Sequence, residues 1–189
     1  MKIVLGVTGS ISAYKACSIV SALVNKGHEV QVVMTNNAQE FITPLSLSTL
    51  SQKPVLTNEE EWNYKYGKIP HIFFPQDWAD VFIIAPCTAN MIAKLSLGMS
   101  DDILSSMALA LLKDMPKIIY PSMNSEMLSN KVTQKNILSL RQGGWIVGQT
   151  QEKRLACGKT GKGGLEITKK IVNSIEAQES YILKNKGKE

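Results

Sequence analysis

The chain has 189 residues, 44% of them hydrophobic and 20% charged, an ordinary composition for a soluble globular protein with one sizeable core. The formal net charge is +5, but the lysines are scattered and no basic stripe with interleaved aromatic residues occurs, so we expect no nucleic acid among the partners. The three cysteines are widely spaced and lie far from either histidine, which argues against a disulfide framework and against a metal site. No apolar run is long enough to span a bilayer or to form the core of a signal peptide, so we predict a cytoplasmic protein without a membrane partner.

Short β-branched runs alternate with helical periodicity along the chain. Residues 2–7 predict a strand, and the apolar residues that follow recur at three- and four-residue spacing until Gly27 ends the helix. A second strand at 29–35 completes a βαβ unit, which implies parallel pairing with a right-handed crossover. Further strands are predicted at 81–85, 117–120 and 145–148, and further helices at 88–98, 103–112 and 165–175. This alternation predicts a single-domain α/β fold with a doubly wound, mostly parallel, Rossmann-like sheet flanked by helices.

Two segments and the C-terminal tail show neither pattern. Residues 56–70 and 149–164 are expected to be irregular, and the polar tail 178–189 is expected to be disordered. The folded domain is therefore predicted to span residues 1–177.

The loops that follow the strands carry the informative residues, because ligands of doubly wound sheets bind beyond the carboxyl ends of the strands. Gly9 and Ser10, in GVTGSIS, suit a phosphate cradle at a helix N-terminus, but Ser10 also suits a plain helix N-cap. The GxGxxG and P-loop fingerprints are absent, so this motif taken alone favours the N-cap.

Three other places have both a functional and a structural interpretation. Thr88 and Asn90, in APCTAN, suit hydrogen bonds to a ring or a phosphate, but Thr88 also suits the cap of the next helix. His71 follows Pro70 in a loop and suits a general base, although a lone histidine is more often structural. Cys157, in the glycine-rich ACGKTGKGG, suits a proton donor or reactive thiolate in a lid, or an incidental cysteine of a surface loop.

The segment PSMNSEM, directly after the strand predicted at 117–120, is unusual for a turn. Turns favour Gly, Asn, Asp or Ser, whereas this one carries Met123, Asn124 and Met127. Together, GVTGSISAYK, APCTAN followed by GMSDDILSS, PSMNSEM and ACGKTGKGG occur in this order over nearly the whole chain. In this combination they resemble the homo-oligomeric flavin-containing cysteine decarboxylases, whose members carry a PASANT motif, a PxMNxxMW motif and a substrate-recognition clamp around ACGxxG.

The resemblance implies FMN as the cofactor and no metal. It assigns His71 as the catalytic base and Cys157 as the proton donor of the clamp. It assigns Asn124 to the substrate carboxylate, with Met123 and Ala156 also at the substrate, and methionines suit the apolar walls of such a site. The residues expected to bind FMN are Gly9, Ser10, Ile11, Thr35, Phe41, Thr88, Ala89, Asn90 and Met91.

The chain departs from the family motifs at several positions. In PASANT, Cys87, Thr88 and Met91 replace Ala, Ser and Thr, so the first hydroxyl is kept and the last is lost. PxMNxxMW ends in Leu128 in place of Trp, and Gly164 stands where a basic residue is common in the clamp. The catalytic positions are all retained.

The resemblance implies a carbon–carbon lyase that decarboxylates a small phosphorylated substrate, 4'-phosphopantothenoylcysteine, to 4'-phosphopantetheine in coenzyme A biosynthesis. It also implies a homo-oligomer, either a trimer or an assembly of trimers, with sites between subunits, and a separate ligase that makes the substrate. Alternatives of the same fold are a decarboxylase of precursor peptides that end in cysteine, a flavin prenyltransferase and a flavin-binding regulatory subunit. The prenyltransferases lack the PxMN loop and the clamp cysteine, and the regulatory subunits tend to carry acidic extensions that this sequence lacks.

Overall fold

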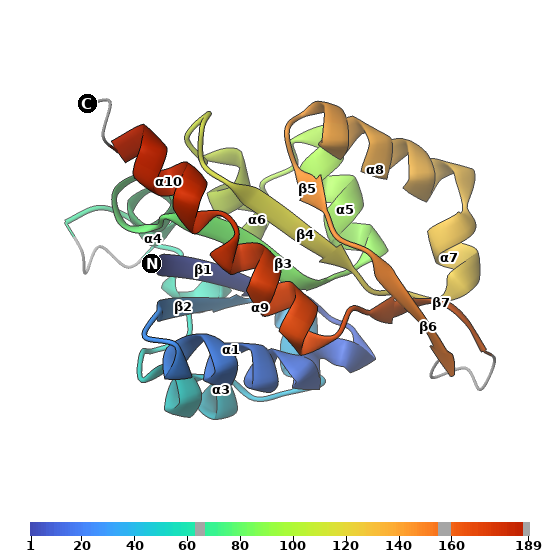
Figure 1. The fold of residues 1–189 in the computed structure, drawn as a ribbon, viewed down its shortest axis with the longest axis horizontal. Helices are drawn as coiled ribbons and strands as arrows, with labels where there is room; N and C mark the ends of the chain where they lie inside the picture. The colour runs from blue at the N-terminus through green and yellow to red at the C-terminus, as the bar shows by residue number, and fades with distance from the viewer. Residues whose placement is uncertain (63–66, 155–159, 187–189) are drawn as a thin grey trace.

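The computed structural model describes residues 1–62, 67–154 and 160–186 and has a five-stranded parallel sheet at its centre (Figure 1). The strand order is β2-β1-β3-β4-β5, with β1 Lys2–Val7, β2 Glu29–Met34, β3 Val81–Cys87, β4 Lys117–Pro121 and β5 Ile146–Val147. Leu5 lies opposite Val32 on one side and Ile83 on the other, so aliphatic residues meet across the ladder. Such runs, buried on both faces, are typical of parallel sheets covered by helices. The predicted doubly wound α/β fold is confirmed.

Helices cover both faces of this sheet, as Figure 1 shows for α1 and α3 on one side and α5, α6 and α8 on the other. One core, which includes Leu5 and Ile19, joins the sheet to α1, α3 and α9, and the other, which includes Phe82 and Ile92, joins it to α5, α6 and α8. No helix in the described parts of the chain is both long enough and apolar enough to cross a bilayer. The bounds are η1 Ile11–Tyr14, α1 Lys15–Asn25, α2 Asn36–Gln39, α3 Pro44–Ser51, η2 Asn58–Glu60, α4 Pro70–Phe73, η3 Phe74–Trp78, α5 Ala89–Leu97, α6 Ile103–Leu109, α7 Ser125–Ser129, α8 Lys131–Gln142, α9 Thr168–Glu176 and α10 Glu179–Lys186.

The prediction of an irregular segment at 149–164 is wrong for the residues that the structure describes there, 149–154 and 160–164. An antiparallel hairpin of β6 Thr150–Arg154 and β7 Thr160–Leu165 occupies it, and Figure 1 shows this hairpin beside α7, away from the five-stranded sheet. Backbone hydrogen bonds stabilise such a ladder even when apolar and polar side chains do not alternate along its strands. The glycines of β7 interrupt this alternation, which is the pattern by which a strand is recognised in a sequence. Leu165 consequently belongs to β7, and α9 begins at Thr168 rather than at residue 165.

The C-terminal tail also differs from its prediction. Within the tail predicted to be disordered at 178–189, residues Glu179–Lys186 form α10, on which Ile182 is buried, and residues 187–189 lie outside the described part of the chain. The amide of Ile182 donates a hydrogen bond to the carbonyl of Gln178 at 2.9 Å, which closes the first turn of α10. The limit of the folded domain at residue 177 stays a prediction.

Candidate active site

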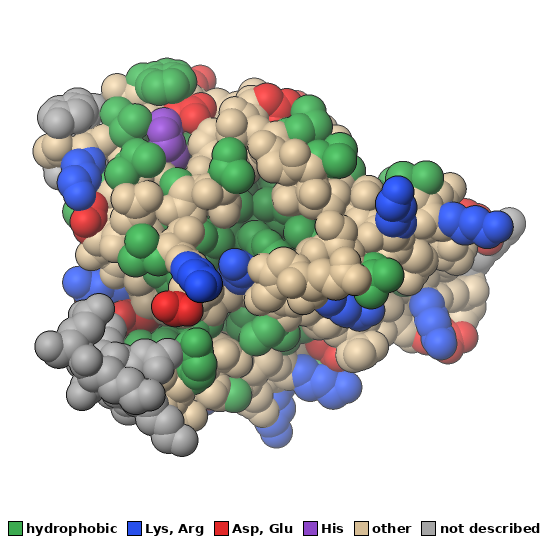
Figure 2. Space-filling view, turned by 90° about the horizontal axis from the view of Figure 1, so that it is seen from above, with side chains coloured by type: hydrophobic (Ala, Val, Ile, Leu, Met, Phe, Trp, Pro, Cys, Tyr) green, Lys and Arg blue, Asp and Glu red, His purple; other side chains and the backbone are tan. Residues whose placement is uncertain are grey.

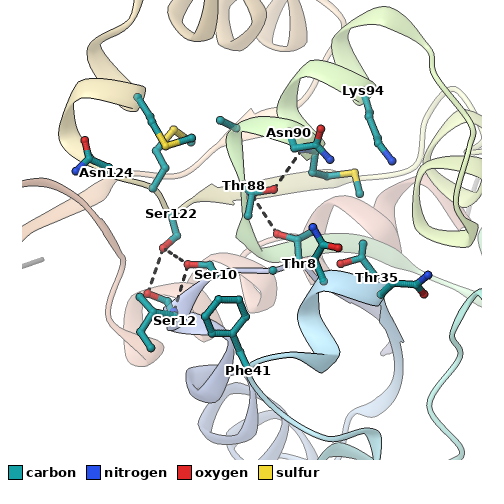
Figure 3. Close-up of a pocket in the computed structure, with 18 of the residues that line it drawn as sticks. Thr8, Ser10, Ser12, Thr35, Phe41, Thr88, Asn90, Lys94, Ser122 and Asn124 are labelled. Atoms are coloured by element: carbon teal, nitrogen blue, oxygen red, sulfur yellow. Dashed lines mark hydrogen bonds between the residues drawn. The ribbon is translucent and has the colours of Figure 1, made fainter. Parts of the chain in front are cut away.

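A cavity of about 1000 Å³ opens at the carboxyl ends of the strands, where β1 lies between β2 and β3 (Figure 3). This is the switch point at which doubly wound sheets bind ligands, and the volume is large for a single small-molecule site. Every residue that the resemblance assigns to FMN lines this cavity, as do Met123 and Asn124. The cavity therefore unites loops that are far apart in the sequence.

The first loop brings a helix N-terminus to the cavity. Ser10 has extended backbone angles and caps η1, with its Oγ accepting a hydrogen bond from the amide of Ser12 at 3.2 Å, which confirms the N-cap. A Cβ on Gly9 would lie 2.5 Å from Cβ of Asn37 and 2.8 Å from its carbonyl oxygen, so glycine allows the loops after β1 and β2 to approach. Backbone N–H groups at the start of a helix attract anions, which suits a phosphate here.

Three buried hydroxyl groups form a cluster beside this loop, as Figure 3 shows. Ser122 Oγ lies 3.1 Å from Ser10 Oγ and donates to Ser12 Oγ at 3.1 Å. Sequence reasoning did not single out Ser12 or Ser122, because each is one small polar residue in a loop and their proximity is a tertiary feature. The cluster links the loop after β1 to the loop after β4.

A second set of hydrogen bonds fixes the loop after β3. Thr8 Oγ1 donates to the carbonyl of Pro86 at 2.8 Å and accepts from the amide of Thr88 at 3.0 Å. Thr88 Oγ1 in turn accepts from the amide of Met91 at 3.3 Å and caps α5, so Thr88 is both the predicted helix cap and part of the cavity wall. Cys87 is fully buried and burial raises the pKa of its thiol, which marks it as a core residue.

The loop after β2 contributes an unsatisfied polar group. Thr35 Oγ1 is buried and, among the described residues, has no hydrogen-bond partner. Phe41, from the same loop, also lines the cavity but leaves 46% of its surface exposed. A buried hydroxyl without a partner in a cavity wall is a natural contact for a polar ligand group.

The loop after β4 is held by the hairpin. The amide of Met123 donates to the carbonyl of Gly163 at 3.0 Å, and Ser125 Oγ donates to the carbonyl of Lys162 at 2.7 Å. Asn124 Oδ1 accepts from the amide of Glu126 at 2.8 Å and so caps α7. The NH2 of an amide is the group that donates to a carboxylate, so this orientation is compatible with the expected role of Asn124.

One lysine in the cavity wall is neutralised by two carboxylates. Lys94 Nζ lies 2.6 Å from Oδ1 of Asp101 and 2.6 Å from Oδ2 of Asp102. Burial on its own would lower the pKa of Lys94, but the hydrogen bonds to both aspartates outweigh it and raise the pKa, while the hydrogen bond from Lys94 lowers the pKa of Asp101. Asp102 also caps α6 by accepting from the amide of Ser105 at 2.9 Å, so the triad ties α5 to α6. The sequence shows no local signal for this pairing.

His71 is not part of the described cavity wall. Its imidazole lies on α4 beside Glu61 and Trp62, outside the cavity of its own chain. Ala156 and Cys157, the other positions assigned by the resemblance, lie outside the described residues. Among the residues that the structure describes, no group of three or more His, Cys, Asp or Glu side chains is placed to hold a metal ion.

The fold and this cavity define a flavin-binding class of protein, and the profile of the flavoprotein family matches residues 1–180, so the chain belongs to the flavoprotein family. Among curated relatives, it is 42% identical over 177 residues to the probable phosphopantothenoylcysteine decarboxylase of Streptococcus mutans, covering 94% of this chain and 98% of that protein. It is 41% identical over 175 residues to the coenzyme A biosynthesis bifunctional protein CoaBC of Bacillus subtilis, covering 92% of this chain but only 42% of that protein.

Two solved structures are similar to this one over almost their whole length. A cysteine-to-serine mutant of PPC decarboxylase in complex with pantothenoylaminoethenethiol has a TM-score of 0.85 at 30% identity, covering 93% of this chain and 96% of that chain. The FMN binding protein AtHal3 has a TM-score of 0.84 at 30% identity, covering 95% of this chain and 97% of that chain. The family expected from the motifs is confirmed.

Proposed function

We propose that this protein is an FMN-dependent lyase that decarboxylates 4'-phosphopantothenoylcysteine to 4'-phosphopantetheine in coenzyme A biosynthesis. The observation that carries the proposal is the single cavity that joins the Gly9–Ser10 loop, the start of α5 and the Met123–Asn124 loop. The relative from Streptococcus mutans, which matches this chain along 98% of its own length, bears the name of this activity and supports the choice of substrate.

The residues present fit FMN. The phosphate would meet the helix N-terminus and hydroxyl groups beside Ser10, and Thr35 Oγ1 would gain the partner that it lacks among the described residues. Phe41, 46% exposed in the cavity wall, offers apolar surface to a flavin ring. When bound, FMN supplies the redox chemistry, taking two electrons from the thiol-bearing carbon of the substrate and returning them to the product.

The residues of the chain bind the substrate and move its protons. Asn124 holds the carboxylate that leaves as CO2, and Met123 and Met127 exclude water around it. His71 accepts the proton of the substrate thiol, and Cys157 donates a proton to the enethiol that remains after CO2 departs. One proton replaces one CO2, so the overall reaction involves no net oxidation.

The position of His71 supports a homo-oligomer, and we propose a trimer or an assembly of trimers. Because His71 lies outside its own cavity, it would reach the substrate in the cavity of a neighbouring copy. Large apolar side chains are exposed both at the cavity, where Ile11 is 57% exposed, and beside His71, where Trp62 is 73% exposed. Figure 2 shows apolar side chains gathered in a hollow of one face, with charged side chains around it. Exposed apolar surface of this kind is typical of an interface.

The pathway context is part of the same proposal. We propose that a phosphopantothenate–cysteine ligase supplies the substrate in the preceding step, which the bifunctional coenzyme A biosynthesis relatives support. We place the reaction in the cytoplasm, with a phosphorylated small molecule as the substrate.

An absorbance spectrum followed by a turnover assay tests the proposal. Purified protein is expected to show flavin absorbance and to convert 4'-phosphopantothenoylcysteine with loss of CO2, detected by mass spectrometry. Cys157→Ser should stall at the oxidised enethiol, and full product from that variant would remove Cys157 from the mechanism. A flavin-loaded protein that acts only on peptides ending in cysteine would be a peptide decarboxylase, and one inert toward both would be a regulatory subunit. A protein that cannot be loaded with FMN would contradict the proposal.

A further inference from the structure

His71 faces a carboxylate outside the cavity. Its Nδ1 lies 3.5 Å from Oε1 of Glu61, and the two side chains are only 16% and 13% exposed. Trp62 packs edge-on against the imidazole, with 5.7 Å between ring centroids and 88° between the planes. Within the described residues, Nδ1 is buried without a hydrogen-bond partner, so Glu61 is the acceptor that faces it.

The backbone that carries Glu61 is fixed by its neighbours. Glu61 follows η2, whose start is closed by a capping box in which the amide and hydroxyl of Thr57 donate to Oε2 of Glu60 at 2.8 Å and 2.7 Å. Asn58 Oδ1 accepts from the amide of Ile103 at 3.1 Å, and Asn58 also lines the cavity. The Glu61 carboxylate is therefore presented from a hydrogen-bonded turn whose first residue, Asn58, lines the cavity.

We propose that Glu61 is a positioning residue for His71, an inference that rests on the proposed function. A carboxylate beside Nδ1 favours the tautomer with its proton on Nδ1 and leaves Nε2 as the basic nitrogen. The 3.5 Å separation is long for a hydrogen bond, and contacts of this kind commonly tighten when substrate binds. Trp62 restricts rotation of the ring from its side. Nε2 then accepts the substrate thiol proton, and Glu61 stabilises the imidazolium that forms.

The tautomer of His71 gives a test that does not depend on turnover. The chain has only two histidines, so FMN-loaded protein with nitrogen-15-labelled histidine gives two ring signals, which a His28→Gln variant assigns. At a pH where an ordinary imidazole is neutral, we expect His71 to carry its proton on Nδ1. Glu61→Met, which removes the acceptor but keeps the side-chain length, should abolish that preference, and Glu59→Gln in the same acidic run should not. An unchanged tautomer in Glu61→Met would overturn the proposal.

Kinetics give the second test. Glu61→Gln is expected to lower kcat by about tenfold to a hundredfold, with KM and FMN content unchanged. This loss is smaller than most of the roughly 10²-fold to 10⁴-fold supplied by a positioned base, because His71 itself is retained. Glu61→Asp should restore part of the loss. In a His71→Asn background, Glu61→Gln should lower kcat no further, because Glu61 acts only through His71, and an equal further loss would contradict the proposal. If the wild-type protein were inactive, the proposed function would be contradicted. The ring tautomer of His71, read from its nitrogen-15 signals, would still show whether Glu61 positions His71.

Discussion

The hydroxyl groups of the cavity differ in how far the protein itself satisfies them. Ser12 and Ser122 hydrogen bond to each other, and Thr88 Oγ1 accepts from the backbone. Thr35 Oγ1 is instead buried without a partner among the described residues. Leaving such a group unsatisfied costs about 1–3 kcal/mol, a cost that a polar group of the proposed FMN would relieve.

Thr35→Val should therefore have opposite effects on the empty and the loaded protein. We expect the apoprotein to be at least as stable as wild type, because valine removes the unsatisfied hydroxyl at nearly constant volume. FMN affinity should fall by about fivefold to tenfold, because one hydrogen bond to the ligand is lost. Thermal unfolding of the apoprotein and fluorescence titration with FMN measure the two quantities.

Thr49→Val, on the exposed side of α3, is the matched control and should leave FMN affinity unchanged. Equal FMN affinities of Thr35→Val and wild type would show that Thr35 does not contact the cofactor.

At the scale of elements, the sequence predicts the strands of the central sheet but misses the two strands of the hairpin, β6 and β7. The strand β1 is predicted with its observed bounds, since a short β-branched run followed by Thr8 and Gly9 favours a strand over a helix. The helix α8 was missed because its apolar face is narrow: only Thr133, Ile137 and Leu140 are buried along Lys131–Gln142, and polar residues cover the rest. The helix 103–112 was predicted too long, because α6 ends at Leu109 although apolar residues continue beyond it.

The candidate site was predictable only in part, for a related reason. Short motifs place Thr88 and Asn124 after strands, and the parallel sheet brings the ends of those strands together. Ser122 carries no local signal, since its partners Ser10 and Ser12 are distant in sequence and only the folded chain unites them. Lys94 and its partner Asp102 are close in sequence, but their pairing depends on how α5 packs against α6. For Thr88, the sequence pattern alone could not decide between a helix cap and a ligand contact, and the ligand contact was expected only from the resemblance to a family. The structure shows that Thr88 caps α5 and also lies in the wall of the cavity.

The hairpin and the loop after β4 meet at a glycine that the geometry requires. Gly163 has φ of +134°, and a Cβ there would collide with the carbonyl oxygen of Met123. We expect Gly163→Ala to break the hydrogen bond from Met123 to Gly163 and to displace β7 from the substrate end of the cavity. Turnover should fall by at least tenfold while FMN binding, which depends on other loops, stays within about twofold of wild type.

Gly143→Ala provides the comparison, because Gly143 has an ordinary φ of −77° at the end of α8 and lies outside the cavity wall. Limited proteolysis of the hairpin, combined with the turnover assay, separates local undocking from global unfolding. Wild-type turnover in Gly163→Ala would mean that the contact between β7 and the Met123 loop has no part in the reaction.

At the scale of the whole molecule, His71 and Asn124 belong to different surfaces. Asn124 lines the cavity, whereas His71 lies beside Glu61 outside it. In a closed ring of identical subunits, each site would then combine Asn124 of one copy with His71 of the next. Each chain would then carry both His71 and Asn124, but a complete site would form only between two chains.

Mixing two inactive variants tests this arrangement. His71→Asn and Asn124→Asp should each abolish turnover when purified alone. When the two chains are co-expressed in equal amounts and assemble at random, about one quarter of the sites should combine an intact His71 with an intact Asn124, because each intact residue is drawn independently with a probability of about one half. Turnover near that fraction of wild type is the expected result. If His71 served the cavity of its own chain, every site would lack one of the two residues and the mixture would stay inactive.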